Sequence, residues 1–294
     1  MKNFPLVSVL IPSYNSNNTL RVAINSIKRQ SYKNLEVIIV DDGSKPKVPN
    51  FNLDPEFSQL KLKLVKLKKN MGISKSLNIG LEHCKGKIIA RLDADDEMLE
   101  DRLINQVEAI LKYDLDLVYS QMMVDGKKNI YYYPISEKAI KICMLYGNAI
   151  PHPAVAIKAE ILRKYKYFDL IVKGLEDYFL WAKIIKSGAR VKGLESYDVN
   201  YKTSSKQLSK KIFDFRYKEA IYYIENLFNS PNYNHENKHS VFTIFKILKM
   251  FKGTDLKAFR IIAVSNIKRS ILQKISIIKK FKLFLSFVII KLYR

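Results

Sequence analysis

The sequence contains few cysteines and no long hydrophobic run. Its 294 residues include only Cys84 and Cys143, which lack the spacing of metal ligands. We therefore expect no disulfide framework and favour a reducing compartment. No apolar run approaches the ~18 residues of a membrane-spanning helix, and the longest candidate, residues 283–290, is short and flanked by lysines. The N-terminal apolar run stops at Pro12, so a signal peptide is not expected either.

Acidic residues are also scarce. The chain has 51 Lys and Arg against 28 Asp and Glu, a formal net charge of +23. Residues 206–294 hold 19 of the basic residues and only 5 of the acidic ones. Such an excess predicts an anionic partner: nucleic acid, a phosphate-bearing ligand or an acidic membrane surface. The basic residues are dispersed and no recognition motif is present, so we expect no nucleic acid, and a basic nucleic-acid- or membrane-binding protein is kept as the alternative.

The first part of the chain alternates between predicted strands and helices. Apolar runs predict strands at 6–12, 35–40, 60–67, 87–92 and near 116–120. Helices are predicted after the first strand, capped by Asn18 or Thr19, then at 73–84 and near 101–113. This spacing indicates right-handed parallel crossovers and an open α/β sheet. Residues 206–294 are rich in lysine and nearly free of glycine, a pattern typical of helices.

Three polar clusters follow predicted strands at their carboxyl ends, where open α/β sheets bind ligands. They are Pro12-Ser13-Tyr14-Asn15, Asp41-Asp42-Gly43-Ser44 and Asp93-Ala94-Asp95-Asp96. Adjacent carboxylates repel one another, so the last cluster predicts a cation. Its oxygens suit Mg²⁺ or Mn²⁺, whose shells phosphate and water complete. The alternatives are structural: acids at a helix N-terminus complement the helix dipole, and Asp-Gly is a common turn.

Two features of the second half are candidates for the same site. His152 lies between two prolines before a predicted strand, and it is either a metal ligand or a structural histidine. Glu176 and Asp177 begin a predicted helix over 174–188, whose apolar face includes Trp181. These acids either complement the helix N-terminus or bring one carboxylate into the site as a base.

Taken in order, six motifs resemble the family 2 glycosyltransferases of the GT-A fold. They are VSVLIPSYN, LEVIIVDDGS, NMGISKSLNIG, RLDADD, HPAVAIKAEIL and GLEDYFLWAKIIKSG, and the likeness covers about residues 5–200. The resemblance implies a Rossmann-like, mostly parallel sheet flanked by helices. It also implies a nucleotide-sugar donor, usually a UDP-sugar, a Mn or Mg cation, and inversion at the anomeric carbon.

The resemblance also implies a division of the chain. We expect a GT-A catalytic domain over residues 1–205, with a nucleotide-sugar half to about residue 120 and an acceptor half over 121–205. A basic helical C-terminal region would follow over 206–294.

The same resemblance assigns roles to individual residues. Those that match nucleotide-sugar contacts are Pro12, Ser13, Tyr14, Asn15, Asp41, Asp42, Lys75, Asp93, Asp95 and Glu176. Asp96 matches the metal ligand, with Asp95 and His152 as further candidates, and Asp177 matches the catalytic base. The family often has Ala-Arg-Asn where this chain has Ser76-Leu77-Asn78, so an arginine near the phosphates is missing and Lys75 is the expected substitute. Glu100 stands where a proline is common.

The residue types agree with glycosyl transfer. One positioned carboxylate accepts the proton of an acceptor hydroxyl, and a cation neutralises the departing diphosphate. A glycoside hydrolase would need two carboxylates that flank the bond. A nucleotidyltransferase is disfavoured because no glycine-rich phosphate loop follows the first strand. The family resemblance therefore implies a hexosyltransferase that moves a hexose or N-acetylhexosamine to a glycan or polyprenyl-linked acceptor in bacterial surface-polysaccharide synthesis. A catalytically inactive relative is the alternative.

The C-terminal segment suggests where such an enzyme would work. Residues 268–294 combine many apolar side chains with eight Lys or Arg and no acid. Such a segment can lie in the interface of an anionic membrane. That would place the protein in the cytoplasm, peripherally on the inner face of the cell membrane. The alternative is a terminal helix that packs on the catalytic domain.

Overall fold

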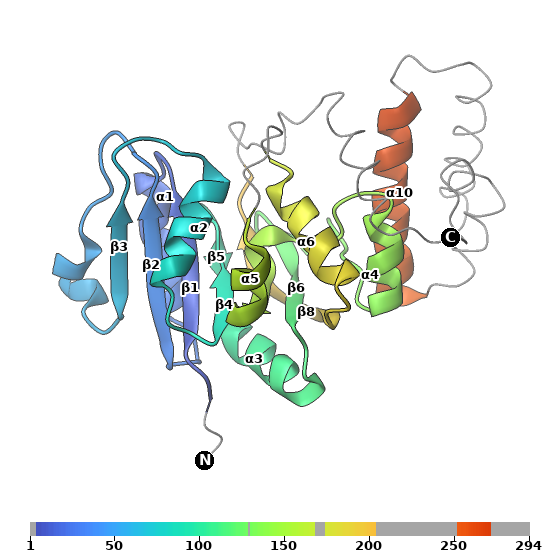
Figure 1. Ribbon diagram of the computed structural model, residues 1–294, viewed down its shortest axis with the longest axis horizontal. Helices are drawn as coiled ribbons and strands as arrows, with labels where there is room; N and C mark the ends of the chain where they lie inside the picture. Colours follow the sequence, from blue (N-terminus) through green and yellow to red (C-terminus); the bar gives the residue numbers. More distant parts are fainter. Residues whose placement is uncertain (1–3, 129, 168–173, 204–251, 272–294) are drawn as a thin grey trace.

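An eight-stranded sheet is the centre of the part of the chain that the computed structural model describes, residues 4–128, 130–167, 174–203 and 252–271 (Figure 1). In chain order its strands are β1 (Val7–Ser13), β2 (Leu35–Asp41), β3 (Leu62–Lys66), β4 (Ile88–Arg91), β5 (Glu97–Met98), β6 (Leu117–Val124), β7 (Val155–Lys158) and β8 (Val191–Tyr201). Their order across the sheet is β3-β2-β1-β4-β7-β6-β8-β5. β7 runs antiparallel to β4 and β6, and β5 runs antiparallel to β8, whereas the other pairs are parallel. The predicted mostly parallel sheet is confirmed.

Helices cover both faces of the sheet. They are α1 (Asn17–Lys28), α2 (Ile73–His83), α3 (Arg102–Tyr113), α4 (Glu137–Met144), α5 (Ala159–Tyr165), α6 (Glu176–Lys186) and α10 (Gly253–Ile271), with short 3-10 turns η1 (Phe51–Leu53), η2 (Pro55–Phe57) and η3 (His152–Ala154). One hydrophobic cluster joins the sheet to α1 and α3, and another joins it to α2, α4, α5, α6 and α10. The predicted elements lie within a few residues of the observed ones. The predicted cap of α1 is wrong, because the helix begins at Asn17, before both Asn18 and Thr19.

The alternation of side chains along the strands explains these two layers. In β2, Val37 and Ile39 face the cluster of α1 and α3, whereas Ile38 and Val40 face the opposite cluster. Every residue of β2 is buried. Because helices cover both faces, β1 and β2 are mostly apolar along their length, with single polar residues such as Ser8 and Glu36, and do not alternate between polar and apolar residues.

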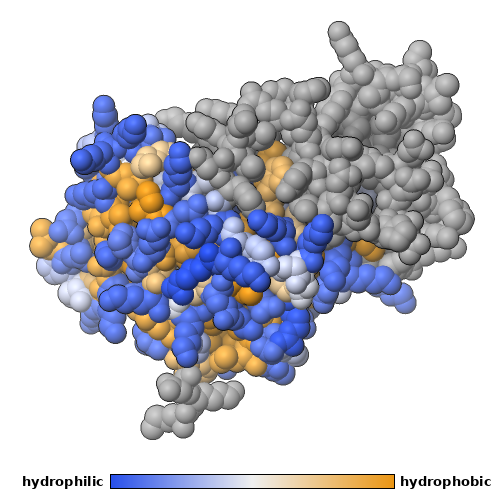
Figure 2. Space-filling view, viewed as in Figure 1, coloured by the Kyte–Doolittle hydropathy of each residue, from blue (hydrophilic) through white to orange (hydrophobic). Residues whose placement is uncertain are grey.

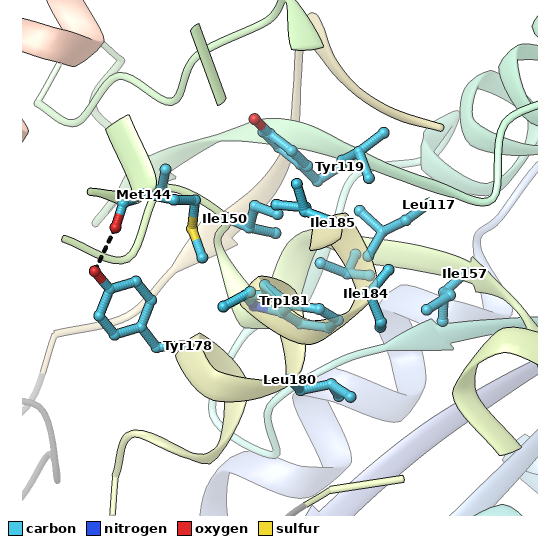
Figure 3. Packing of buried hydrophobic residues seen from close by; sticks show 14 of the residues in the cluster. Leu117, Tyr119, Met144, Ile150, Ile157, Tyr178, Leu180, Trp181, Ile184 and Ile185 are labelled. Atoms are coloured by element: carbon cyan, nitrogen blue, oxygen red, sulfur yellow. Dashed lines mark hydrogen bonds between the residues drawn. The ribbon is translucent and has the colours of Figure 1, made fainter. Parts of the chain in front are cut away.

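The larger cluster brings α6 against the sheet (Figure 3). Trp181 is fully buried in it, beside Ile184 and Ile185 of the same helix. The hydroxyl of Tyr178 donates a hydrogen bond to the carbonyl of Met144 and so ties α6 to α4 (Figure 3). This packing fixes the first turn of α6, which carries Glu176 and Asp177.

The C-terminal helix α10 belongs to the same packed unit. It lies beside α4 (Figure 1), and the ring of Phe259 meets that of Tyr146 edge-on with centroids 5.2 Å apart. Phe259 and Ala263 are fully buried in the larger cluster. This part of the predicted basic region is therefore helical and packs on the domain. The predicted boundary at residue 205 and residues 272–294 of the predicted membrane segment lie outside the described residues.

The face seen in Figure 2 is mostly hydrophilic, and hydrophobic residues show in patches between the polar side chains. Among the residues that the structure describes, no helix is long and apolar enough to span a membrane.

The turn after β2 requires glycine at position 43. Its φ of +76° is in the left-handed region, and a Cβ there would lie 2.4 Å from the carbonyl carbon of Lys69. Gly126 has a similar φ of +78°, but nothing lies within 4 Å of its Cβ position. An alanine at either position would have a strained backbone, but only an alanine at position 43 would also make a steric clash.

We expect Gly43→Ala to lower the free energy of unfolding by about 1–3 kcal/mol more than Gly126→Ala, because only the first adds overpacking to the strain of a positive φ. Urea unfolding of both variants measures the difference. Equal losses would show that the loop of residues 69 and 70 can move away without cost.

Candidate active site

The structure brings the three predicted polar clusters to one edge of the sheet. β1 pairs in parallel with both β2 and β4, with Ser13 opposite Asp41 and Leu10 opposite Arg91. The carboxyl ends of these strands therefore point the same way. β7 runs in the opposite direction, so η3 and His152, which precede it, lie at this edge too.

The loop after β1 is bonded to the loop after β2. The carbonyl of Ser13 accepts the N–H of Asp42 at 2.8 Å. The N–H of Asn15 donates to Ser44 Oγ at 2.9 Å, and Asn15 Oδ1 accepts the N–H of Lys45 at 2.8 Å. Tyr14 is half exposed, whereas Ser13 is buried and its hydroxyl has no hydrogen-bond partner among the described residues. The first two polar clusters therefore act as one unit.

Asp41 and Asp42 both organise loops. The carboxylate of Asp41 accepts the N–H groups of Ser44 at 2.8 Å and Val48 at 3.2 Å. The carboxylate of Asp42 accepts those of Met71 at 2.7 Å and Gly72 at 2.9 Å. Asp42 thus ties its loop to the start of α2. Lys75 is exposed in the first turn of that helix.

A buried arginine lies next to the third cluster. The side chain of Arg91 is 3% exposed, and its Nη2 bonds Asp93 Oδ1 at 2.5 Å. Its Nε and Nη1 have no hydrogen-bond partner among the described residues. Burial alone would lower the pKa of Arg91, but Asp93, Tyr167 and Asp96 together raise it above the ordinary value. Arg91 is therefore a fixed positive charge beside the aspartates.

The carboxylate of Asp96 lies in surroundings that are unfavourable for its negative charge. It is buried, its Oδ1 accepts the N–H of Lys202 at 2.9 Å, and its Oδ2 has no partner in the described part of the chain. Burial and the neighbouring charge of Asp93 raise the pKa of Asp96 well above its usual value. The same two causes raise the pKa of Asp95. The capping alternative finds no support, because α3 begins only at Arg102 and no side chain caps it.

A divalent cation fits these residues. Within the described ranges no three His, Cys, Asp or Glu residues already form a metal-binding group. Mg²⁺ and Mn²⁺, however, commonly take only one or two carboxylates, with phosphate and water as the other ligands. The unpaired Oδ2 of Asp96 is a buried acceptor of the required kind. Asp96 and the neighbouring Asp95 are thus the residues suited to hold such an ion.

The acids of α6 form the other half of the site. Asp177 Oδ2 accepts Asn148 Nδ2 at 2.7 Å, and Oδ1 accepts the N–H of Tyr178 at 2.7 Å. Glu176 Oε2 accepts the N–H of Gly174 at 2.8 Å. Burial, and next the charge of Glu176, raise the pKa of Asp177 to about 7. A carboxyl group with that pKa can both take up and release a proton near neutral pH.

His152 is buried in an aromatic environment. Its Nε2 lies 3.0 Å from the hydroxyl of Tyr167, and its ring meets that of Trp181 edge-on. Burial and then the charge of Arg91 lower the pKa of His152 well below its usual value, so the ring is neutral. Asn78 holds the main chain of Tyr167 through both its N–H and its C=O. These contacts are those of a structural histidine, and a role as metal ligand stays a prediction.

The two groups of acids lie within electrostatic range of each other. The charge of Asp93 contributes to the raised pKa of Glu176, although burial contributes most. Burial also raises the pKa of Tyr167, and Asp177, Glu176 and Asp93 add to this effect while Arg91 opposes it. The structure therefore joins the predicted metal-binding aspartates and the predicted base in one acidic site around Arg91.

Sequence analysis missed several residues of this site. Arg91 had a signal, since it is a charged residue inside an apolar strand. Asn148 and Tyr167 had no comparable signal, because only the fold brings Asn148 to Asp177 and Tyr167 to His152.

Known proteins resemble this chain in sequence. Residues 8–168 match the model of the family described as glycosyl transferase family 2. An uncharacterized glycosyltransferase of Haemophilus influenzae is 29% identical over 226 residues, which cover 71% of this chain and 69% of that protein. An Escherichia coli protein, UDP-Glc:alpha-D-GlcNAc-diphosphoundecaprenol beta-1,3-glucosyltransferase WfgD, is 30% identical over 182 residues, which cover 62% of this chain and 70% of that protein.

Solved structures share the fold. Staphylococcus aureus TarS 1–349 in complex with UDP-GlcNAc superposes with a TM-score of 0.62 at 16% identity, over 90% of this chain and 80% of that one. The mannosyltransferase PcManGT of Pyrobaculum calidifontis, in complex with GDP-Man and Mn²⁺, gives a TM-score of 0.58 at 17% identity, over 97% and 74% of the two chains. At these identities the likeness concerns the fold alone.

Proposed function

Because the chain belongs to glycosyl transferase family 2, we propose that it moves a hexose or N-acetylhexosamine from a nucleotide-sugar to a hydroxyl group of a glycan or lipid-linked acceptor. The donor is a UDP-sugar, the reaction inverts the anomeric carbon, and a divalent cation is required. The name of the WfgD relative includes UDP-Glc and alpha-D-GlcNAc-diphosphoundecaprenol. This supports a UDP-sugar as donor and a lipid-linked acceptor. The product belongs to a bacterial surface polysaccharide such as capsule, O-antigen or lipooligosaccharide.

One observation supports this proposal most strongly. The acids after β4 and the acids of α6 lie in one site, yet their surroundings differ. Asp96 keeps an unpaired buried oxygen that suits a cation, whereas both oxygens of Asp177 are hydrogen-bonded and its pKa is raised to about 7 by burial and by Glu176. Two carboxylates with different surroundings can serve as cation ligand and as proton acceptor in one reaction.

Asp177 is the proposed catalytic base. Its carboxylate takes the proton of the acceptor hydroxyl while the hydroxyl oxygen bonds to the anomeric carbon and the bond from that carbon to the diphosphate breaks. Asn148 donates to Asp177 Oδ2 and holds the carboxylate in place. Attack on the face opposite the leaving group inverts the configuration.

The donor side is formed by the loops after β1, β2 and β4. Asp41 and Asp42, with Pro12, Ser13, Tyr14 and Asn15, would surround the nucleotide, Asp93 and Asp95 would face the ribose and Lys75 the phosphates. Glu176 would contact the donor sugar. A cation held by Asp96, with Asp95 beside it, would neutralise charge on the leaving diphosphate.

The proposed location is the inner face of the cell membrane, where a lipid-linked acceptor would be met in two dimensions. The support is the basic and apolar character of residues 268–294. Lys and Arg side chains near an anionic surface contribute about 1 kcal/mol each to binding.

The first test is release of nucleoside diphosphate from a panel of UDP-, GDP- and dTDP-sugars. We expect the wild-type protein to hydrolyse one class slowly with Mn²⁺ or Mg²⁺ and to stop when the metal is chelated. Asp96→Asn should lose metal-dependent binding of the nucleoside diphosphate in calorimetry. Asp101→Asn is the control, because Asp101 is exposed and, although it is the N-cap residue of α3, its side chain makes no capping hydrogen bond. An unchanged metal-dependent affinity in Asp96→Asn would exclude Asp96 as ligand.

The second test concerns the base. Asp177→Asn should lower transfer by about two to four orders of magnitude with donor binding nearly unchanged. In the wild type the rate should fall as the pH drops through about 7, because the raised pKa of Asp177 leaves it protonated below that value. Asn148→Ala removes a hydrogen bond that lowers this pKa, so the acid limb should move to higher pH. If the acid limb of the pH–rate profile is at the same pH in Asn148→Ala as in the wild type, the group that titrates is not Asp177.

The third test is flotation with vesicles that contain anionic phosphatidylglycerol. The full chain should bind and be released by high salt, and a chain that ends at Ile271 should not bind. The shortened chain keeps α10, whose Phe259 is part of the core. Replacing Lys279, Lys280 and Lys282 with Gln leaves the apolar residues and should weaken binding. Equal flotation of full-length and shortened chains would contradict the membrane role of this segment.

A further inference from the structure

Residues 130–135, which we name the tyrosine segment, connect the end of β6 to α4 and contain Tyr131, Tyr132 and Tyr133. The segment has no regular secondary structure. It is nevertheless held on three sides, by β6, by β8 and by α10. Such a degree of support is unusual for a connection, which ordinarily lies loosely on the surface.

The sheet holds the segment through main-chain bonds. The side chain of Gln121 in β6 accepts the N–H of Tyr133 at 2.9 Å and donates to its carbonyl at 3.0 Å. The hydroxyl of Tyr119 donates to the carbonyl of Pro134. The N–H of Gly193 in β8 donates to the carbonyl of Ile135 at 3.0 Å, and a Cβ at Gly193 would come within 2.4 Å of the carbonyl oxygen of Pro134.

The C-terminal helix holds the segment from the other side. One oxygen of Asp255 accepts the N–H of Ile135 at 2.6 Å and that of Ser136 at 3.2 Å, and the other accepts the hydroxyl of Ser136 at 2.7 Å. The ammonium group of Lys257 lies 5.1 Å from the centre of the Tyr132 ring. α10 therefore fixes the point at which the tyrosine segment enters α4.

These supports place Tyr133 beside the acidic site. Its ring packs against both the large hydrophobic cluster and the small one formed by Met122, Ala154 and Val199. Burial and the neighbouring Tyr201 and Tyr131 raise the pKa of its hydroxyl, and the charges of Asp177 and Asp96 add to the effect. The packing gives the same placement, because Ala154 belongs to η3, two residues after His152, and Val199 belongs to β8, which is followed by Lys202, whose N–H bonds Asp96 Oδ1.

The direction of approach distinguishes the donor from the acceptor. Apart from Glu176 of α6, the proposed donor contacts come from the loops after β1, β2 and β4 and from the first turn of α2, all before residue 100. Tyr133 comes from the connection after β6, in the predicted acceptor half of residues 121–205. An aromatic ring supplies a large rigid contact surface with a polar tip, which suits the apolar face and hydroxyl groups of a sugar.

We propose that Tyr133 is the platform on which the acceptor sugar lies beside Asp177, and that Asp255 of α10 is the positioning residue that holds this platform in place. The proposal rests on the transferase function proposed above. It gives the C-terminal region a part in acceptor binding that is independent of any membrane.

The acceptor contact is tested with GlcNAc-α-diphosphate carrying an undecyl chain as acceptor and with the sugar-nucleotide that the panel selects. We expect Tyr133→Ala to raise KM for this acceptor about three- to tenfold, the range typical of one aromatic contact. KM for the donor, measured by hydrolysis without acceptor, should not change. Tyr133→Phe keeps the ring and should stay close to the wild type. An unchanged acceptor KM in Tyr133→Ala, or a donor KM raised equally, would overturn the platform.

The positioning role is tested by hydrogen exchange, which needs no acceptor. Asp255→Ala should speed exchange of the amides of Ile135 and Ser136 and raise the acceptor KM in the same direction as Tyr133→Ala. Asp255→Asn keeps an acceptor oxygen, so its amide exchange and its acceptor KM should both lie between those of the wild type and of Asp255→Ala. If Asp255→Ala does not fold, Asp255→Asn replaces it in the comparison with the wild type. Asp54→Ala is the control, because Asp54 also accepts a main-chain N–H, that of Glu56, but at the start of η2, and its loss removes in addition only the ion pair with Arg21.

The outcomes separate the two proposals. Normal exchange at residues 135 and 136 in Asp255→Ala, or an acceptor KM that stays at the wild-type value, would overturn the role of Asp255. Absence of donor hydrolysis by the wild type would overturn the proposed function. Donor hydrolysis without transfer to this probe would overturn the proposed lipid-diphosphate acceptor and the proposed contact of that acceptor with Tyr133. The exchange of the amides of residues 135 and 136 would still test the role of Asp255.

Discussion

The guanidinium of Arg91 is the charge on which the arrangement of the site depends. Its side chain is buried at the end of β4 and bonds Asp93, and its main-chain carbonyl accepts a hydrogen bond at 2.8 Å from Arg102, itself buried. Carboxylates gathered in one buried place repel each other and resist losing water. The positive charge of Arg91 opposes the raised pKa of Asp95, Asp96 and Glu176. Without that charge the pKa of each of these acids would be raised further, because burial and the neighbouring carboxylates would act unopposed.

The reversed strand β7 explains how acids from distant parts of the sequence meet. The first four strands of the sheet order, β3-β2-β1-β4, form a parallel unit whose carboxyl ends carry the first polar clusters. β7 then enters in the opposite direction between β4 and β6. Its preceding turn η3 therefore brings His152 to the edge where β4 delivers Arg91. The helix α6 follows shortly afterwards and packs on the same face through Trp181, with Glu176 and Asp177 in its first turn.

The positive charge of the chain and the acidity of its site are complementary features. A net charge of +23 resides largely on exposed lysines and in the C-terminal region, whereas the acids of the site are buried, as Asp96 and Glu176 are, or half-buried, as Asp93, Asp95 and Asp177 are. The positive charge of the surface would attract an anionic substrate, whereas the carboxylates of the site would repel it if no cation were present. A divalent ion at Asp96 would reconcile the two, since it joins carboxylates to phosphates. The C-terminal helix adds to this a structural part, because Asp255 holds the connection that carries Tyr133.

Local patterns in the sequence were sufficient to predict most of the strands and helices and the polar clusters that follow β1, β2 and β4. Periodicity and turn residues are local signals, and parallel strands necessarily deliver their carboxyl ends to one edge. The sequence also left structural alternatives open for Asp41 and Asp42, and the fold shows both carboxylates bonded to loop N–H groups. The contacts between distant side chains became visible only in the folded chain: Asn148 bonds Asp177, 29 residues away, and Asp255 bonds Ile135, 120 residues away. Contacts between side chains so far apart depend on how helices pack across the sheet, and no pattern within one segment records that packing.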